Sequence, residues 1–126
     1  MSKQFKAVFE LFNERPIPQS DKLQLIFKRP YSEEEQIKLV PFFDKPVQAQ
    51  IREYVPEGGE KTTEAEIDGV FHVISTKPDR LANGNKTGFV IEKMYDRENH
   101  KNVIQLYQKD CEIFMEIIQE ELPGME

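Results

Sequence analysis

Hydrophobic and polar residues alternate along much of this chain, and a period of two residues is typical of a β-strand with one buried face. The alternation is clearest in residues 5–12, 22–29 and 47–53. Phenylalanines spaced three and four apart in the first segment also fit a helix, but the density of aromatic residues favours a strand. The side chains that these strands would bury are Phe5, Ala7, Phe9, Leu11, Leu23, Leu25, Phe27, Val47, Ala49 and Ile51.

The middle of the chain predicts a β-meander. The sequence PEGGE turns the chain after residues 47–53, and residues 61–67 run back. Asp68-Gly69 is then a two-residue hairpin signal, because both residue types tolerate positive φ. Two further segments, residues 70–76 and 88–95, are apolar on both faces, so we expect them in the centre of the sheet.

A short element follows the second strand, and its type stays open. Ser32 with Glu35 has the spacing of a capping box, which predicts a helix over residues 33–40 that ends before Pro41. Ile37 and Leu39 also alternate as in a strand, and the sequence does not separate the two readings.

The C-terminal segment changes to a period of three to four residues, which predicts an amphipathic helix of about twenty residues. Asn99 or Asn102 is suitable as its N-cap, and Pro123-Gly124 would end it. The residues with the helical spacing are Val103, Tyr107, Cys111, Phe114, Ile118 and Leu122.

These elements predict an α+β fold that is mainly antiparallel β. Six or seven strands would form a small barrel or sandwich, and the C-terminal amphipathic α-helix would close it. With 126 residues the chain has the size of one domain, so we expect a single globular domain over residues 1–126.

One weak internal repeat is visible in the order of elements. A strand, a long proline-containing loop, a second strand, a tyrosine and an acidic turn occur in residues 8–35 and again in residues 70–99. A true duplication predicts a pseudo-twofold arrangement with both long loops at one end. Two strand–loop–strand units in a small β domain also produce this order by chance.

The charge and the N-terminal sequence restrict the class of protein. The net charge is −6, from 17 basic and 23 acidic residues, which disfavours non-specific binding to nucleic acid. A single cysteine forms no internal disulfide and suits a reducing compartment. The first residues, MSKQFKAVFELF, lack the apolar run of a signal peptide or membrane helix, so we expect a cytoplasmic protein without membrane contact.

No group of residues predicts catalysis, a metal site or a cofactor. His72 lies within a strand-like segment, which favours a partly buried histidine. His100 has Asp96 and Glu98 nearby in sequence, but three such ligands on a polar segment are more typical of a solvated turn than of a metal site. Cys111 falls on the apolar side of the expected helix. We therefore expect a protein that is not an enzyme.

One third of the chain is locally basic, and it suggests single-stranded nucleic acid as a ligand. Proteins of that class combine a basic groove with aromatic side chains on which bases stack, often in an OB-like barrel. The loop of residues 77–86 is longer than most hairpins need. The candidate contacts, to nucleic acid or to another partner, are Lys77, Arg80, Lys86, Lys93, Arg97, Tyr95, Tyr31 and Arg29.

A protein-interaction role is the function that the sequence favours over this alternative. Residues 47–53 alternate glutamine and arginine on one face and are flanked by Pro46 and Pro56, which is typical of a protected edge strand. The apolar side of the C-terminal helix must be buried on its own sheet or on a second copy. We expect a small accessory protein, similar in layout to phage accessory proteins, that binds a protein partner or itself.

Overall fold

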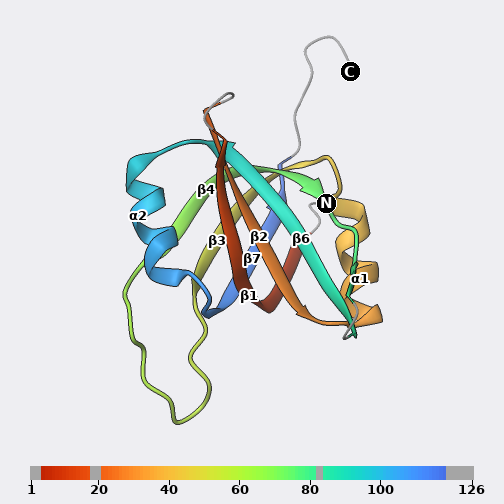
Figure 1. Ribbon diagram of the computed structural model, residues 1–126, viewed down its shortest axis with the longest axis horizontal. Helices are drawn as coiled ribbons and strands as arrows, with labels where there is room; N and C mark the ends of the chain where they lie inside the picture. The colour runs from red at the N-terminus through yellow and green to blue at the C-terminus, as the bar shows by residue number, and fades with distance from the viewer. Residues whose placement is uncertain (1–3, 18–20, 82–83, 119–126) are drawn as a thin grey trace.

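The strands wind around one axis in the computed structural model, which describes residues 4–17, 21–81 and 84–118 (Figure 1). The elements, in chain order, are β1 (Gln4–Ile17), β2 (Lys22–Pro30), α1 (Glu33–Leu39), the 3₁₀ helix η1 (Val40–Phe42), β3 (Pro46–Glu53), β4 (Glu66–Ser75), β5 (Asp79–Leu81), β6 (Gly84–Met94), α2 (Arg97–Leu106) and β7 (Asp110–Ile117).

Six of the described strands close into an antiparallel barrel. Their order is β2-β1-β7-β3-β4-β6, and β6 pairs back to β2. The short strand β5 pairs with β6 alone among the described strands. The predicted α+β fold with a mainly antiparallel sheet and a C-terminal helix is confirmed, and the closed order of strands is that of a barrel.

Closure of the barrel corrects two expectations about the middle of the chain. The strand at residues 47–53 exists as β3, but it is not an edge strand, because it pairs with β4 on one side and β7 on the other. The hairpin at Asp68-Gly69 is wrong, since both residues lie inside β4 and pair with Gln50 and Ala49. Residues 66–75 form one strand, and residues 57–65 belong to a connection.

The predicted C-terminal helix exists only as far as Leu106, and the prediction is wrong for residues 110–117. Helix α2 ends at Leu106, and residues 110–117 form β7, which fills the barrel between β1 and β3. Its N-cap is Asp96, whose side chain accepts from the Glu98 amide, and neither Asn99 nor Asn102 has that role. The expected end at Pro123-Gly124 lies outside the described residues. No described helix is long and apolar enough to cross a membrane.

The open choice at residues 33–40 resolves as a helix. Ser32 caps α1, because its hydroxyl accepts from the Glu35 amide at 3.3 Å. The Ser32 amide donates to the Thr87 hydroxyl of β6 at 2.8 Å, so the second half of a capping box is replaced by a tertiary hydrogen bond. Pro41 lies within η1, one residue past the predicted end of the helix.

The barrel interior is filled by the alternating apolar residues. The side chains expected on the inner face of β1, β2 and β3 are buried, apart from Ala7, which is half-buried. Four phenylalanines meet in the centre, and the ring centroids of Phe89 and Phe27 are 5.0 Å apart. Phe5 and Phe9 pack edge-on against Phe89, at 6.3 and 5.2 Å. Each of these buried rings contributes about 1.5–3 kcal/mol to the driving force for folding.

The barrel consists of two equivalent units related by a pseudo-twofold axis. The first unit contains β1, β2, α1 and β3, and the second contains β4, β6, α2 and β7. The pair β1–β2 within the first unit corresponds to β4–β6 within the second, and the pair β1–β7 between the units corresponds to β4–β3. The pairs β2–β6 and β3–β7 join the units, and each maps onto itself. We call residues at matching positions twins.

The match between the units extends to single residues. Leu11 pairs with Phe27, and the register then shifts before Asn13. Their twins are Val73 and Ile91, which pair in the same way before a shift at Ser75. The turns after the two helices match as well. Asp44 has φ of 59° and donates its amide to the Val73 carbonyl at 2.8 Å, while Gln108 has φ of 61° and donates to the Leu11 carbonyl at 2.8 Å.

The pseudo-twofold arrangement expected from the internal repeat is therefore present, but the expected position of its loops is wrong. Strands β2 and β6 are antiparallel neighbours, with Lys22 opposite Met94 and Pro30 opposite Lys86. The start of β2 and the start of β6, which the two loops precede, consequently lie at opposite ends of the barrel (Figure 1).

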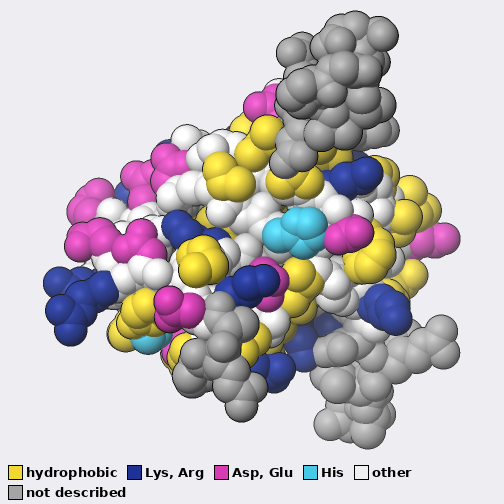
Figure 2. All heavy atoms as spheres, turned by 90° about the horizontal axis from the view of Figure 1, so that it is seen from above, with side chains coloured by type: hydrophobic (Ala, Val, Ile, Leu, Met, Phe, Trp, Pro, Cys, Tyr) yellow, Lys and Arg dark blue, Asp and Glu magenta, His cyan; other side chains and the backbone are white. Residues whose placement is uncertain are grey.

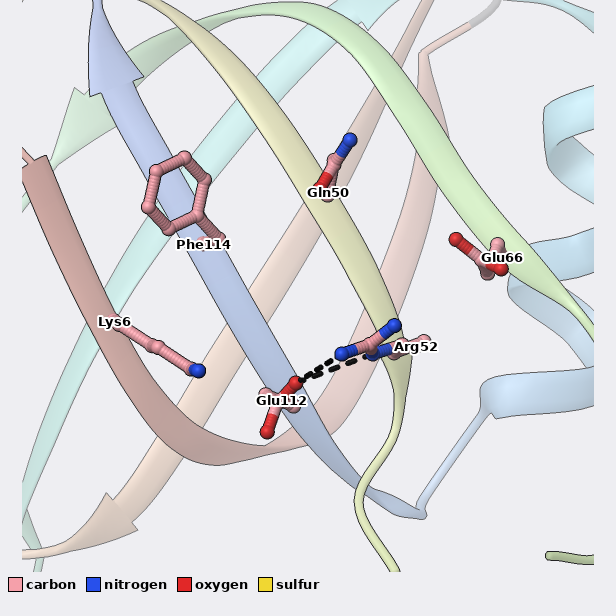
Figure 3. Close-up of a pocket in the computed structure, with 6 residues that line it drawn as sticks. All are labelled: Lys6, Gln50, Arg52, Glu66, Glu112 and Phe114. Carbon is pink, nitrogen blue, oxygen red and sulfur yellow. Dashed lines mark hydrogen bonds and ion pairs between the residues drawn. The ribbon is translucent and has the colours of Figure 1, made fainter.

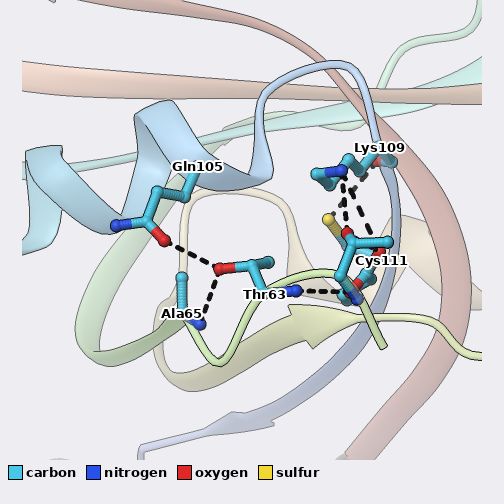
Figure 4. A network of polar contacts seen from close by, with 7 residues as sticks. Thr63, Ala65, Gln105, Lys109 and Cys111 are labelled. Carbon is cyan, nitrogen blue, oxygen red and sulfur yellow. Dashed lines mark hydrogen bonds and ion pairs between the residues drawn. The ribbon is translucent and has the colours of Figure 1, made fainter. Parts of the chain in front are cut away.

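A connection over residues 54–65 joins the two units and projects from the barrel (Figure 1). Its base is fixed by Glu53, whose carboxylate accepts from the Thr62 hydroxyl at 2.6 Å and from the Thr63 amide at 3.1 Å. Hydrogen bonds from Thr62 hold the pKa of Glu53 below its usual value. The Thr63 hydroxyl donates to the Gln105 side chain of α2 at 2.7 Å (Figure 4).

Candidate functional site

The residues expected to contact a ligand are divided between the two ends of the barrel. Lys77 is exposed in the β4–β5 connection, and Lys86 lies opposite Pro30 in the β2–β6 pair. The residues of this first end are Arg29, Tyr31, Lys77, Arg80 and Lys86. The residues of the second end are Lys93, Tyr95 and Arg97. Tyr31 and Tyr95 are twins, as are Arg29 and Lys93, so the pseudo-twofold axis itself separates them.

Acidic groups accompany the basic ones at both ends. Lys93 lies 3.9 Å from the Asp96 carboxylate, and Lys22 lies 3.1 Å from Glu92. Helix α1, which begins with three glutamates, packs against β6 near the first end. Figure 2 shows basic side chains spread over the face seen from above, with acidic and hydrophobic side chains between them. A continuous basic groove across all eight candidates is not formed.

Two hollows lie where neighbouring strands of a unit part from each other. In the first unit β1 and β2 stop pairing beyond Glu10 and Lys28, and in the second unit β4 and β6 stop beyond His72 and Glu92. The lining residues are twins at one position after another, so the pseudo-twofold axis relates the two hollows. We name them the charged hollow and the apolar hollow.

The charged hollow lies in the first unit and measures about 240 Å³. Arg29 of β2 bridges to β1 across this gap. Its guanidinium donates to the Val8 carbonyl at 3.4 Å and lies 5.6 Å from the centroid of the Phe9 ring. The residues that line the charged hollow are Val8, Glu10, Lys28, Arg29, Pro30, Lys86 and Asp110. Five ionic side chains of both signs make this surface typical of solvated protein exterior.

The apolar hollow lies in the second unit and measures about 490 Å³. Lys93 takes the place of Arg29, and its ammonium lies 5.6 Å from the Phe71 ring centroid. Val70 is 53% exposed and Met94 is 59% exposed. The lining residues are Lys22, Pro46, Val70, Phe71, His72, Glu92, Lys93 and Met94. Pro46 and Met94 stand where the charged hollow has Asp110 and Pro30, and His72 stands where it has Glu10.

A third hollow of about 220 Å³ lies on the outer face of β1, β7, β3 and β4, across the pseudo-twofold axis (Figure 3). Two of its polar residues are engaged with each other, because Arg52 donates to Glu112 at 2.9 and 3.1 Å. Gln50 pairs with Phe114 at the centre of the β3–β7 ladder. An exposed ion pair of this kind contributes little free energy.

Helix α2 is tied to β1 by a chain of three titratable side chains. The Tyr95 hydroxyl lies 2.9 Å from His100 Nδ1, and His100 Nε2 lies 3.3 Å from Glu14 Oε2. The twin of His100 is Gln36, whose amide donates to the backbone carbonyl of Thr76. Gln36 in α1 and His100 in α2 thus occupy equivalent positions, and each contacts the other unit. None of the three titratable residues lines either twin hollow, so the chain has the geometry of a structural anchor.

The other residues considered for chemistry are accounted for by packing. His72 is half-buried, as expected, and its Nε2 lies 2.7 Å from Asp44 Oδ1. His100 is not in a solvated turn, because its side chain is only 20% exposed. Among the described residues no group of histidine, cysteine and acidic side chains has the arrangement of a metal site.

Cys111 is buried in β7, and burial raises the pKa of its thiol to about 12. At about pH 8 only about one thiol in ten thousand is ionised, so we expect an aromatic disulfide reagent to leave the folded chain unmodified and to react fully in guanidinium chloride. The folded chain keeps this proton to a higher pH than the unfolded chain. The free energy of unfolding should therefore fall between about pH 9 and about pH 12. Rapid modification of the native chain would contradict this assignment.

The apolar hollow was not found from the sequence, because its residues come from β2, β3, β4 and β6 and share no spacing. The only available signal was the internal repeat, in which Val8-Phe9 matches Val70-Phe71 and Arg29 matches Lys93. No protein family, curated protein or solved structure matches this chain.

Proposed function

We propose that this is a non-enzymatic accessory protein that binds a protein partner, or a second copy of itself, through the apolar hollow. The observation that supports the proposal is the difference between the twin hollows. They share one backbone arrangement, yet the first is lined by five ionic side chains and the second exposes Val70 and Met94. Exposed apolar side chains around a hollow are typical of contact surfaces.

The exposed side chains of the apolar hollow add little to the fold. Val70 of β4 and Met94 of β6 point away from the barrel interior, which Phe71 and Val73 of β4 help to fill. An apolar side chain that is exposed in the isolated chain gains about 25 cal/mol for each Å² that a partner covers. The twin positions Val8 and Pro30 stand among ionic neighbours and provide a built-in comparison.

The test is a double substitution, Val70→Ser with Met94→Ser, in a tagged chain expressed in its own cells. We expect recovery of co-purifying protein to fall about tenfold or more, because the apolar contact is lost while the core is unchanged. Sedimentation of the purified chain then shows whether the partner is a second copy. The matched control is Lys28→Ser with Lys86→Ser in the charged hollow. Equal losses in both variants, or no loss in the first, would contradict the proposal.

Single-stranded nucleic acid is the second candidate ligand, because five of the eight expected contacts lie together at the first end of the barrel. The test is anisotropy of labelled single-stranded DNA at about 50 and about 200 mM salt, with the triple variant Lys77→Ser, Arg80→Ser, Lys86→Ser. Each lost phosphate contact should lower the salt slope by about 0.7. Lys93→Ser with Arg97→Ser is the control. If protein binding is the function, the triple variant keeps its partner and DNA binds weakly or not at all.

A further inference from the structure

Strand β4 presents backbone groups without a strand partner at the apolar hollow. In the described residues the β4–β6 ladder begins with the pair His72 and Glu92, and no strand pairs with β4 on this side before His72. The hollow is bordered by three consecutive residues of each strand, residues 70–72 and 92–94. The gap between the strands is therefore the hollow itself.

The twin unit shows in which direction the backbone of Val70 points. The Val8 carbonyl accepts from Arg29 of β2, so it points away from β7, with which Val8 pairs at Glu112. In an antiparallel ladder the N–H and C=O of one residue point to the same side. Val70 is the twin of Val8 and pairs with Gln48 of β3 in the equivalent register. Its N–H and C=O consequently face the hollow.

Lys93 does not bond to the N–H and C=O of Val70, whereas Arg29 bonds to the carbonyl of Val8. Its ammonium lies 3.4 Å from the position that a Cβ on Gly69 would take, and it contacts the Phe71 ring and Asp96. It makes no described hydrogen bond to Val70, where Arg29 bonds the twin carbonyl. The 3.9 Å separation from Asp96 is long for a charge-assisted hydrogen bond, so the half-buried ammonium retains capacity for a second carboxylate.

We propose that the partner binds as a short extended peptide segment that adds to β4 at Val70. Its backbone would form hydrogen bonds to the N–H and C=O of Val70, in the position that β6 leaves when it turns toward α2. An acidic side chain of the peptide would lie beside Lys93, and apolar side chains would cover Met94 and Pro46. This inference rests on the proposed function and specifies the chemistry of the partner.

The experiment is selection of displayed random dodecapeptides on the full chain, followed by titration of the enriched peptides as synthetic ligands. We expect peptides in which apolar residues alternate and at least one aspartate or glutamate is present. Val70→Pro removes the N–H that faces the hollow without removing a bond to β3, and it should weaken binding about tenfold or more. Val70→Thr keeps the N–H and should bind nearly as the parent chain does.

The charge is tested by Lys93→Gln, which should weaken acidic peptides about tenfold, with Arg97→Gln as a control at the same end. Since Val70→Pro can also disturb the strand, N-methylation of single peptide amides provides a second test on the unchanged protein. No enrichment, or binding that survives both Val70→Pro and peptide N-methylation, would overturn the inference. If peptides fail while Val70→Ser with Met94→Ser still loses the cellular partner, the proposed function stands and only the extended-peptide mode is wrong.

Discussion

Replacing Phe89 by alanine should lower the free energy of unfolding by about 3–5 kcal/mol, the range observed for buried phenylalanines. Phe89 is 2% exposed and lies where both units meet, in the β2–β6 pair. Its ring contacts Phe5 and Phe9 of β1 and Phe27 of β2, so truncation leaves a cavity whose walls come from two neighbouring strands and cannot easily collapse. Urea unfolding followed by circular dichroism measures the change.

Phe43→Ala is the control for this truncation, since Phe43 is 51% exposed in the turn after η1. We expect a change within about 0.5 kcal/mol, as is usual for surface positions. Because small domains are stable by only about 5–15 kcal/mol, the Phe89 variant should be partly unfolded at moderate temperature. A loss below about 1 kcal/mol would show that the four-ring cluster is not the centre of the core.

The strands near the N-terminus were predictable because a half-buried strand imposes a period of two on its residues. Strand β7 was not, since two periods coincide there. Cys111, Ile113 and Met115 alternate inward, while Val103, Tyr107 and Cys111 also have helical spacing. The barrel needs a strand between β1 and β3, and this long-range pairing overrides the local preference. The turn after α2 has a positive φ at Gln108. Glycine or asparagine usually occupies such a position, so glutamine gave no sequence signal that the helix ends there.

Symmetry explains why the candidate contacts were predicted as one group and found as two. The end of β2 is marked by a basic residue, a tyrosine and a helix-capping residue, and the end of β6 has the same three residue types. The sequence therefore shows the same pattern twice, and both copies were read as parts of one site. The pseudo-twofold axis then carries Tyr31 and Tyr95 to opposite ends. Twins of the same residue type, such as Phe9 and Phe71, are buried in the core and stabilise the fold. Twins that differ, such as Pro30 and Met94, give the two ends different surfaces.

Replacing Gly88 by alanine should destabilise the chain by about 2–3 kcal/mol through overpacking between β2 and β6. A Cβ on Gly88 would lie 2.6 Å from the Phe27 carbonyl oxygen, and a backbone atom cannot rotate away as a flexible side chain can. The two strands would have to separate where Phe27 and Phe89 stack. Thermal unfolding monitored by calorimetry measures the loss.

The twin of Gly88 supplies the control, because Gln24 occupies the equivalent place in β2 and pairs with Glu92. Gln24 carries a Cβ and a long side chain that donates to Glu92 at 3.2 Å, so the backbone there already accommodates a substituent. We expect Gln24→Ala to change the free energy of unfolding by less than about 1 kcal/mol. Similar losses of unfolding free energy in both variants would contradict the prediction, because they would show that the tight contact is not specific to Gly88. A large loss in Gly88→Ala alone would locate the tight approach at the first end of the barrel, between Arg29 and the ring cluster.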